Sequence, residues 1–186
     1  TALEAGVHRV HGCAMGVGER VGNTSMDLLL LNLKLMGWID NDLTSLVPYV
    51  NKVAKATRFP IPVNYPLSGR DAFRTATGVH AAAIVKAQRR GDAWLADRVY
   101  SGVPAGEFGK EQEIEIGHMS GMSNVRYWLE KRRIPATDAL CKAILTRAKS
   151  CAWTLSEAEV RAVARPKKTA AKRPRAKKAA SSRARG

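Results

Sequence analysis

A leucine-dense segment that follows a glycine-rich loop is the feature of this 186-residue chain that most limits its possible folds. The run GVGERVGNTSMDLLLLNLKLMGW predicts a helix over 24–36 that ends at Gly37. Leucines occupy so much of this helix that we expect it to be buried on more than one side. A short strand is expected over 8–13, so strand, loop and helix make one β/α unit. Because a last turn of helix, ending near Gly6, is expected before it, the unit looks like the last of a series.

The glycine-rich loop carries Glu19, Arg20 and Asn23. Charged and amide groups that a rigid scaffold holds on a loop indicate function more often than packing. The alternative is a structural turn, in which glycines provide backbone freedom and Asn23 or Thr24 caps the helix. The loop alone leaves both interpretations open.

The rest of the pattern predicts short helices on both sides of an extended connector. The segment FPIPVNYP has three prolines within residues 60–66, which favours extended backbone. In EQEIEIG, isoleucines alternate with polar residues and predict a short strand over 111–117. Ser156 and Glu159 match a capping box. Helices are expected over 44–56, 80–90, 123–133 (capped by Ser123), 137–150 (begun by Thr137) and 156–164.

The net charge of +15 is concentrated at the carboxyl end. Residues 166–186 contain nine Lys or Arg and no acid, which leaves +6 for residues 1–165. This tail lacks aromatic and large aliphatic side chains and is expected to be disordered. It predicts either nonspecific contact with nucleic acid through phosphate neutralisation or a solubilising extension.

Membrane and disulfide-rich classes do not fit the composition. No apolar run approaches the roughly 20 residues that span a bilayer, and no signal-peptide pattern follows Thr1. The three cysteines, Cys13, Cys141 and Cys151, form no CxxC pair and are odd in number. Reduced thiols in a cytoplasmic protein are therefore favoured.

Three segments, in order, resemble one enzyme family. GVGERVGN is similar to the closing active-site motif of the 2-isopropylmalate, homocitrate and citramalate synthases. SGRDAFRTATGVHAAAIVKA is similar to the segment after the barrel in that family, which holds a Gly-x-His. YSGVPAGEFGKEQEIEIGHMSGMSNVRYWL resembles the family's linker subdomain. The family's enzymes are TIM barrels that condense acetyl-CoA with a 2-oxo acid.

The resemblance implies roles for the loop residues. Asn23 matches the Asn that gives an oxygen to a divalent metal, which would be Mg, Mn or Zn. Glu19 matches a carboxylate near the acetyl group that orients it or accepts a proton. Arg20 would neutralise Glu19 and hold the loop. Barrel active sites lie at the carboxyl ends of strands, where this loop is expected.

Three further residues take roles from the same resemblance. His80 matches the Gly-x-His histidine and is the candidate for acid/base catalysis, with a structural histidine as the alternative. Tyr100 matches a linker tyrosine that reaches a neighbouring subunit's active site and donates a hydrogen bond to the developing oxyanion. His11, on the expected strand before the loop, is either a packing residue or a neighbour of the site.

The expected fold is α/β: the last β/α unit of a TIM barrel, a small α+β, mainly helical linker subdomain, and a disordered basic tail. The family's His-x-His metal strand has no counterpart here, so we expect a carboxyl-terminal fragment or truncated gene product that is inactive alone. The expected divisions are 1–58 for the final β/α unit and following helix, 59–99 for the connector and post-barrel segment, 100–165 for the linker subdomain and 166–186 for the tail.

The expected activity is a 2-isopropylmalate synthase-like condensation of acetyl-CoA with 2-oxoisovalerate, in leucine biosynthesis. The expected assembly is a homodimer with exchanged linker subdomains. Homocitrate or citramalate synthase chemistry is the alternative within the family. A basic-tailed nucleic-acid-binding protein is the alternative outside it.

Overall fold

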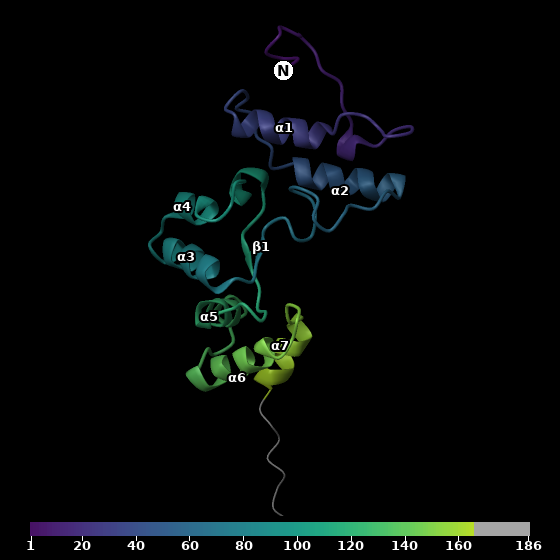
Figure 1. Cartoon of the computed structure of the whole chain (residues 1–186). Helices are drawn as coiled ribbons and strands as arrows, with labels where there is room; N and C mark the ends of the chain where they lie inside the picture. Colours follow the sequence, from purple (N-terminus) through teal and green to yellow (C-terminus); the bar gives the residue numbers. More distant parts are fainter. Residues whose placement is uncertain (166–186) are drawn as a thin grey trace, which may run out of the picture.

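The computed structural model describes residues 1–165, and the expectations for the basic tail lie outside them. Figure 1 shows helices α1 and α2 toward one end, α5, α6 and α7 at the other, and a parallel strand pair with α3 and α4 between. The elements in chain order are 3₁₀ turn η1 (Ala14–Gly16), α1 (Met26–Leu35), α2 (Leu46–Thr57), β1 (Arg74–Thr75), α3 (Gly78–Arg89), α4 (Ala93–Arg98), 3₁₀ turn η2 (Ala105–Phe108), β2 (Glu113–Ile114), α5 (Met122–Lys131), α6 (Asp138–Lys149) and α7 (Glu157–Ala164).

The strands pair β1 with β2, with Arg74 opposite Glu113 and Thr75 opposite Ile114. Residues 1–165 thus form a mixed, mainly helical α/β arrangement with one two-stranded parallel sheet. The helices expected over 44–56, 80–90, 137–150 and 156–164 are confirmed within about two residues, and the strand expected over 111–117 is confirmed as the shorter β2. Within 1–165, no helix is long and apolar enough to cross a membrane.

The two largest of four apolar clusters among residues 1–165 lie toward opposite ends of this arrangement. The first joins α1 and α2 to the connector and η2, with Phe108 fully buried. The second joins α5, α6 and α7, with Leu129, Ile144 and Val160 fully buried. The two cores share no residue, so each end of the chain has its own packed interior.

The strand expected over 8–13 is wrong. Only Cys13 forms a bridge, a parallel one with Ser25, in which Cys13 N donates to Thr24 O at 3.1 Å. A strand needs a neighbouring strand to accept its backbone hydrogen bonds, and the described residues place none beside residues 8–12.

Two expected helix caps are also wrong. Helix α1 begins at Met26 with Ser25 as its N-cap, so neither Asn23 nor Thr24 caps it. Helix α5 has Gly121 as its N-cap in place of Ser123, because the Asn124 side chain accepts a hydrogen bond from Gly121 N at 3.1 Å. In both cases the helix begins one or two residues away from the expected cap, and neither N-cap residue makes a side-chain cap hydrogen bond.

Helix α1 is buried on one side only. Leu31 packs in the first core, whereas Leu33 lines a cavity of about 440 Å³ with Val10 and His11. Met36 and Trp38, which also line this cavity, are 56% and 46% exposed. One face of helix α1 therefore packs in the first core, and the other face lines the cavity.

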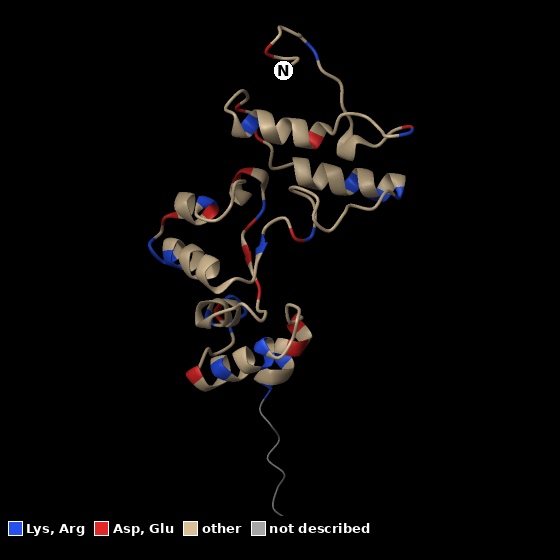
Figure 2. Cartoon of the chain, viewed as in Figure 1, with Lys and Arg blue, Asp and Glu red and all other residues tan. Residues whose placement is uncertain are grey.

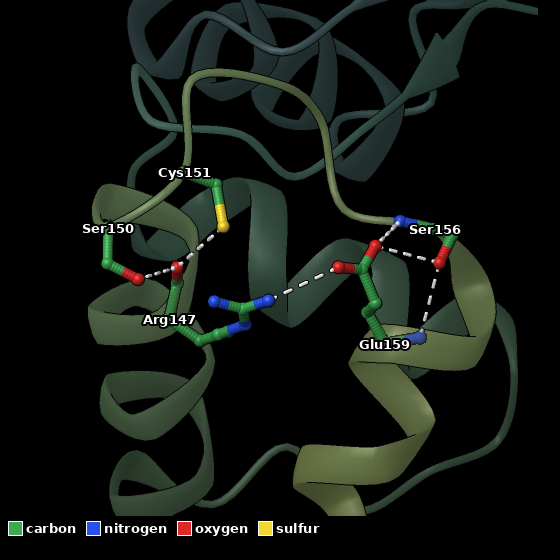
Figure 3. A network of polar contacts seen from close by, with 5 residues as sticks. All are labelled: Arg147, Ser150, Cys151, Ser156 and Glu159. Carbon is green, nitrogen blue, oxygen red and sulfur yellow. Dashed lines mark hydrogen bonds and ion pairs between the residues drawn. The ribbon is translucent and has the colours of Figure 1, made fainter.

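The predicted capping box begins helix α7, and its glutamate is also bound by Arg147 of α6, as Figure 3 shows at close range. Ser156 N donates to Glu159 Oε2 at 2.9 Å, and Glu159 N donates back to Ser156 Oγ at 3.3 Å. Arg147 of α6 donates to Glu159 Oε1 at 3.4 Å. Hydrogen bonds from the Ser156 backbone and hydroxyl, with the Arg147 charge, lower the pKa of Glu159 below its ordinary value.

Acidification is expected to loosen α7. Because the folded-state pKa of Glu159 lies below the unfolded value, its stabilisation is complete above about pH 4.5 and is lost as pH falls through the folded pKa. Far-UV circular dichroism melts between pH 6 and 3 should show this loss, and Glu159→Gln should reduce it. Glu4→Gln, which changes a glutamate far along the chain from α7, is the control. An identical pH dependence in Glu159→Gln and wild type would contradict the prediction.

Candidate functional site

Glycines let the loop between η1 and α1 close tightly on itself. Asn23 N donates to Gly16 O at 2.8 Å, and Gly22 N donates to Glu19 O at 2.8 Å. Gly16 has a φ of +66°, and a Cβ there would lie 2.5 Å from Asn23 O. A Cβ at Gly22, whose φ is +89°, would lie 2.1 Å from Gly16 O. A side chain at either position would open the loop.

A buried carboxylate fastens both ends of this loop. Asp27, in the first turn of α1, is fully buried and accepts a hydrogen bond from Met15 N at 2.6 Å. Its other oxygen accepts a hydrogen bond from the Tyr65 hydroxyl at 2.8 Å. Burial, with a smaller contribution from the Asp27 carboxylate, raises the pKa of Tyr65 to about 12. The phenol therefore stays protonated at neutral pH and remains a donor to Asp27.

The side chains predicted as functional project from this loop into solvent. Glu19 and Arg20 form an ion pair of 3.8 Å, and their side chains are 88% and 86% exposed. The Asn23 amide nitrogen donates to Val17 O at 3.2 Å. No hydrogen bond to the Asn23 amide oxygen is found among residues 1–165, so this oxygen is available as a ligand.

His80 and Tyr100 lie against each other. Their ring centroids are 4.1 Å apart and the rings are inclined by 28°. His80 is the third residue of α3, and Tyr100 follows α4. Val99 packs against the buried face of α3, which brings the next residue, Tyr100, beside the histidine. Tyr100 remains 51% exposed, so the pair opens to solvent.

The structure keeps these two groups of residues apart. Figure 1 shows the glycine-rich loop before α1 at the right, whereas α3 and α4 lie at the left. His11 belongs to neither group and lies exposed beside the apolar cavity at α1. Within this chain, then, Glu19 and Asn23 share one loop and His80 and Tyr100 form a separate pair.

Residues 1–165 do not by themselves supply a full set of metal ligands. Within 1–165, no cluster of three His, Cys, Asp or Glu side chains could hold a metal. Asn23 offers one amide oxygen, which is a ligand type that suits a hard divalent cation. The described residues therefore fit a contribution to a metal site and do not form one.

A cavity of about 890 Å³ lies beside the strand pair, where Figure 2 shows acidic and basic residues interleaved. Arg74 bonds Glu113 at 3.0 Å and Glu115 at 2.9 Å, and Lys131 bonds Glu111 at 2.6 Å. Hydrogen bonding from Lys131 lowers the pKa of Glu111. The lining of this cleft therefore carries charges of both signs, several of them joined in ion pairs.

Comparisons with known proteins give relatives but no family model: no protein-family model matches the chain. It is 28% identical over 150 residues to a probable 2-isopropylmalate synthase of Methanopyrus kandleri. This alignment covers 80% of this chain and 28% of that protein. It is 31% identical over 145 residues to a homocitrate synthase of Methanothermobacter thermautotrophicus, covering 76% and 35%. It is 31% identical over 134 residues to an (R)-citramalate synthase of Aquifex aeolicus, covering 70% and 24%. The chain thus spans about a third or less of the length of these relatives.

Proposed function

This chain belongs to the family of 2-isopropylmalate, homocitrate and citramalate synthases, and we propose that it forms part of an acetyl-CoA-condensing acyltransferase. The proposed reaction joins the acetyl methyl carbon to the keto carbon of a 2-oxo acid, after which water cleaves the thioester and releases CoA. The methyl group loses a proton and the keto oxygen gains one. The reaction therefore needs a base, an acid and groups that stabilise negative charge.

The His80–Tyr100 pair is the observation that carries the proposal. An imidazole can both accept and donate a proton, and a phenol hydroxyl can donate a hydrogen bond to an oxyanion. The 4.1 Å stack brings both side chains to one solvent-facing point. In the proposed mechanism His80 transfers the proton at the reacting carbon or oxygen, and Tyr100 donates to the oxygen that becomes negative.

The loop before α1 serves the other half of the proposed site. Asn23 would contribute its amide oxygen to a divalent cation whose further ligands come from outside this chain. When bound, that ion supplies polarisation of the 2-oxo acid carbonyl. Glu19 orients the acetyl group or takes its proton, and Arg20, paired with it at 3.8 Å, holds the carboxylate in place. The tight Gly16–Asn23 closure keeps these side chains together.

We propose that the two groups act in different copies of the site within a homodimer. Their separation within one chain supports this arrangement, since His80 and Tyr100 would reach a site whose loop belongs to the neighbouring subunit. For the substrate we propose 2-oxoisovalerate, as in leucine biosynthesis. Homocitrate and citramalate synthases are equally close relatives, so 2-oxoglutarate and pyruvate are the alternatives.

A chimera tests the proposal. Residues 1–165 replace the matching region of the Methanothermobacter thermautotrophicus homocitrate synthase, and CoA release is measured with acetyl-CoA, a divalent metal and each of the three 2-oxo acids. We expect thiol release that depends on both substrates. The unaltered homocitrate synthase is the control for assay conditions. A folded, dimeric chimera that released no CoA with any of these acids would overturn the proposal.

A further inference from the structure

We propose that Ser120 and Asn124 are positioning residues that fix His80 against Tyr100, an inference that rests on the proposed function. Both residues are buried and polar, with Ser120 6% exposed and Asn124 fully buried. Buried polar side chains are retained only where hydrogen bonds satisfy them. Their partners are therefore informative, and they converge on the segment that leads into α3.

The two side chains hold the carbonyls at the ends of both strands. Ser120 Oγ donates to Ala76 O at 2.7 Å, and it lies 3.4 Å from Glu115 O. The Asn124 amide nitrogen donates one hydrogen to Ala76 O at 3.2 Å and the other to Glu115 O at 3.0 Å. Ala76 directly follows β1 and Glu115 directly follows β2, so these bonds join the two strands where their own pairing ends.

The remaining polar atoms of the pair are also satisfied. Ser120 Oγ accepts from Gly117 N at 2.8 Å, and the Asn124 amide oxygen accepts from Gly121 N at 3.1 Å. Asn124 thus uses both amide hydrogens and its oxygen, which fixes the orientation of the amide. A network with every member satisfied is rigid, because moving one group costs several bonds at once.

The entry of α3 is docked directly onto this network. Gly78 N donates to Met119 O at 2.9 Å, and a Cβ at Gly78 would lie 3.0 Å from Gly121 N. A side chain at Gly78 would therefore press on the backbone of Gly121, which would have to shift by a few tenths of an ångström. His80 follows two residues later, so the clamp on Ala76 and the contact at Gly78 set the position of the imidazole.

The loss of one clamp residue should therefore show at His80. Catalytic groups displaced by about an ångström lose much of their effect, although the displaced side chain itself is intact. The ring stack gives a direct reporter, because Tyr100 shifts the proton resonances of an imidazole 4.1 Å away. A purely structural role for Ser120 and Asn124 would lower stability and leave that shift unchanged.

The test uses nuclear magnetic resonance of the full 186-residue chain, which has four histidines to assign. Tyr100→Leu defines the His80 shifts without the stacked ring. In Ser120→Ala and in Asn124→Ala we expect the His80 resonances to move most of the way to the Tyr100→Leu values. Ser123→Ala, a serine-to-alanine change on α5 between the two clamp residues, should leave them unchanged.

Two results would overturn the inference. One is a folded Ser120→Ala protein whose His80 shifts equal those of the wild type. The other is a wild-type shift that Tyr100→Leu does not alter. If Asn124→Ala does not fold, Ser120→Ala alone decides the matter, because that variant loses the 2.7 Å bond to Ala76 O and the bond from Gly117 N while the Asn124 bonds help to keep the protein folded.

Activity in the chimera separates this inference from the proposed function. Ser120→Ala should lower kcat about tenfold with KM nearly unchanged, because substrate binding does not involve the clamp. An inactive parent chimera would remove the proposed function and leave the resonance shifts to decide the positioning role. An active parent with an unchanged kcat in Ser120→Ala would count against the inference alone.

Discussion

Replacing His80 by alanine is expected to lower kcat of the chimera by about 10²- to 10⁴-fold, the range attributed to a positioned acid or base. The histidine is only partly buried, and its ring stacks on Tyr100 and is not enclosed in a core. Its removal should therefore have little effect on folding. Steady-state CoA release, together with a thermal melt of the same protein, measures both effects.

Two matched variants sharpen this prediction. Tyr100→Phe keeps the aromatic ring beside His80 and removes only the hydroxyl, so it should lower kcat less than a full truncation while KM changes little. Val79→Ala changes the neighbouring residue of α3, which is 62% exposed, and should leave kcat unchanged. Equal activity in His80→Ala and in the parent chimera would show that the histidine is not part of the chemistry.

Replacing Asp27 by alanine is expected to destabilise the amino-terminal half by about 3 kcal/mol, since two donors lose their acceptor in a buried place. Met15 N and the Tyr65 hydroxyl would both be left unpaired. The loop that carries Glu19 and Asn23 would then be held only by its own backbone bonds. Chemical denaturation of the full chain measures the loss, and hydrogen exchange at residues 14–25 locates it.

Asp27→Asn is the matched control for Asp27→Ala, because asparagine has nearly the same size and shape as aspartate. Asparagine keeps an oxygen for Met15 N and offers its amide hydrogens to the Tyr65 oxygen, so it should cost much less than alanine. Tyr65→Phe removes one of the two donors and should fall between them. If alanine and asparagine were equally mild, Asp27 would not be what holds the ends of the loop together.

Local signals in the sequence predicted local structure well. Thr137 begins α6 and accepts a hydrogen bond from Leu140 N at 3.3 Å, and Ser156 with Glu159 forms the predicted box. Such caps involve residues three apart, so a few neighbouring side chains determine their geometry. Helix α2 likewise follows its apolar face, with Val50 fully buried.

Features that depend on distant partners were predicted poorly. Strand β1 has two residues and exists only because β2, nearly forty residues later, accepts it as a neighbour. The strand expected over 8–13 has no such neighbour and does not form. The buried role of Asp27 was not predicted, because an acidic residue in the first turn of a helix is ordinarily exposed and interacts favourably with the helix dipole. Only the hydrogen bonds from Met15 and Tyr65 reveal its buried role.

The same contrast between local and distant interactions holds for the candidate site. His80 and Tyr100 were singled out by resemblance to a family, and neither periodicity nor composition distinguishes them. Their contact follows from the packing of α3 with Val99, which no local pattern encodes. Ser120 and Asn124 carried no signal of their own, because serine and asparagine near a turn usually face water.

The presence of two separate cores has a consequence for how the chain melts. One cooperative transition requires that loss of packing at one end removes support from the other. Here the interior of α5, α6 and α7 shares no side chain with that of α1 and α2. A calorimetric scan should therefore give an enthalpy larger than the van't Hoff value, because two partly independent units absorb heat and unfold at different temperatures.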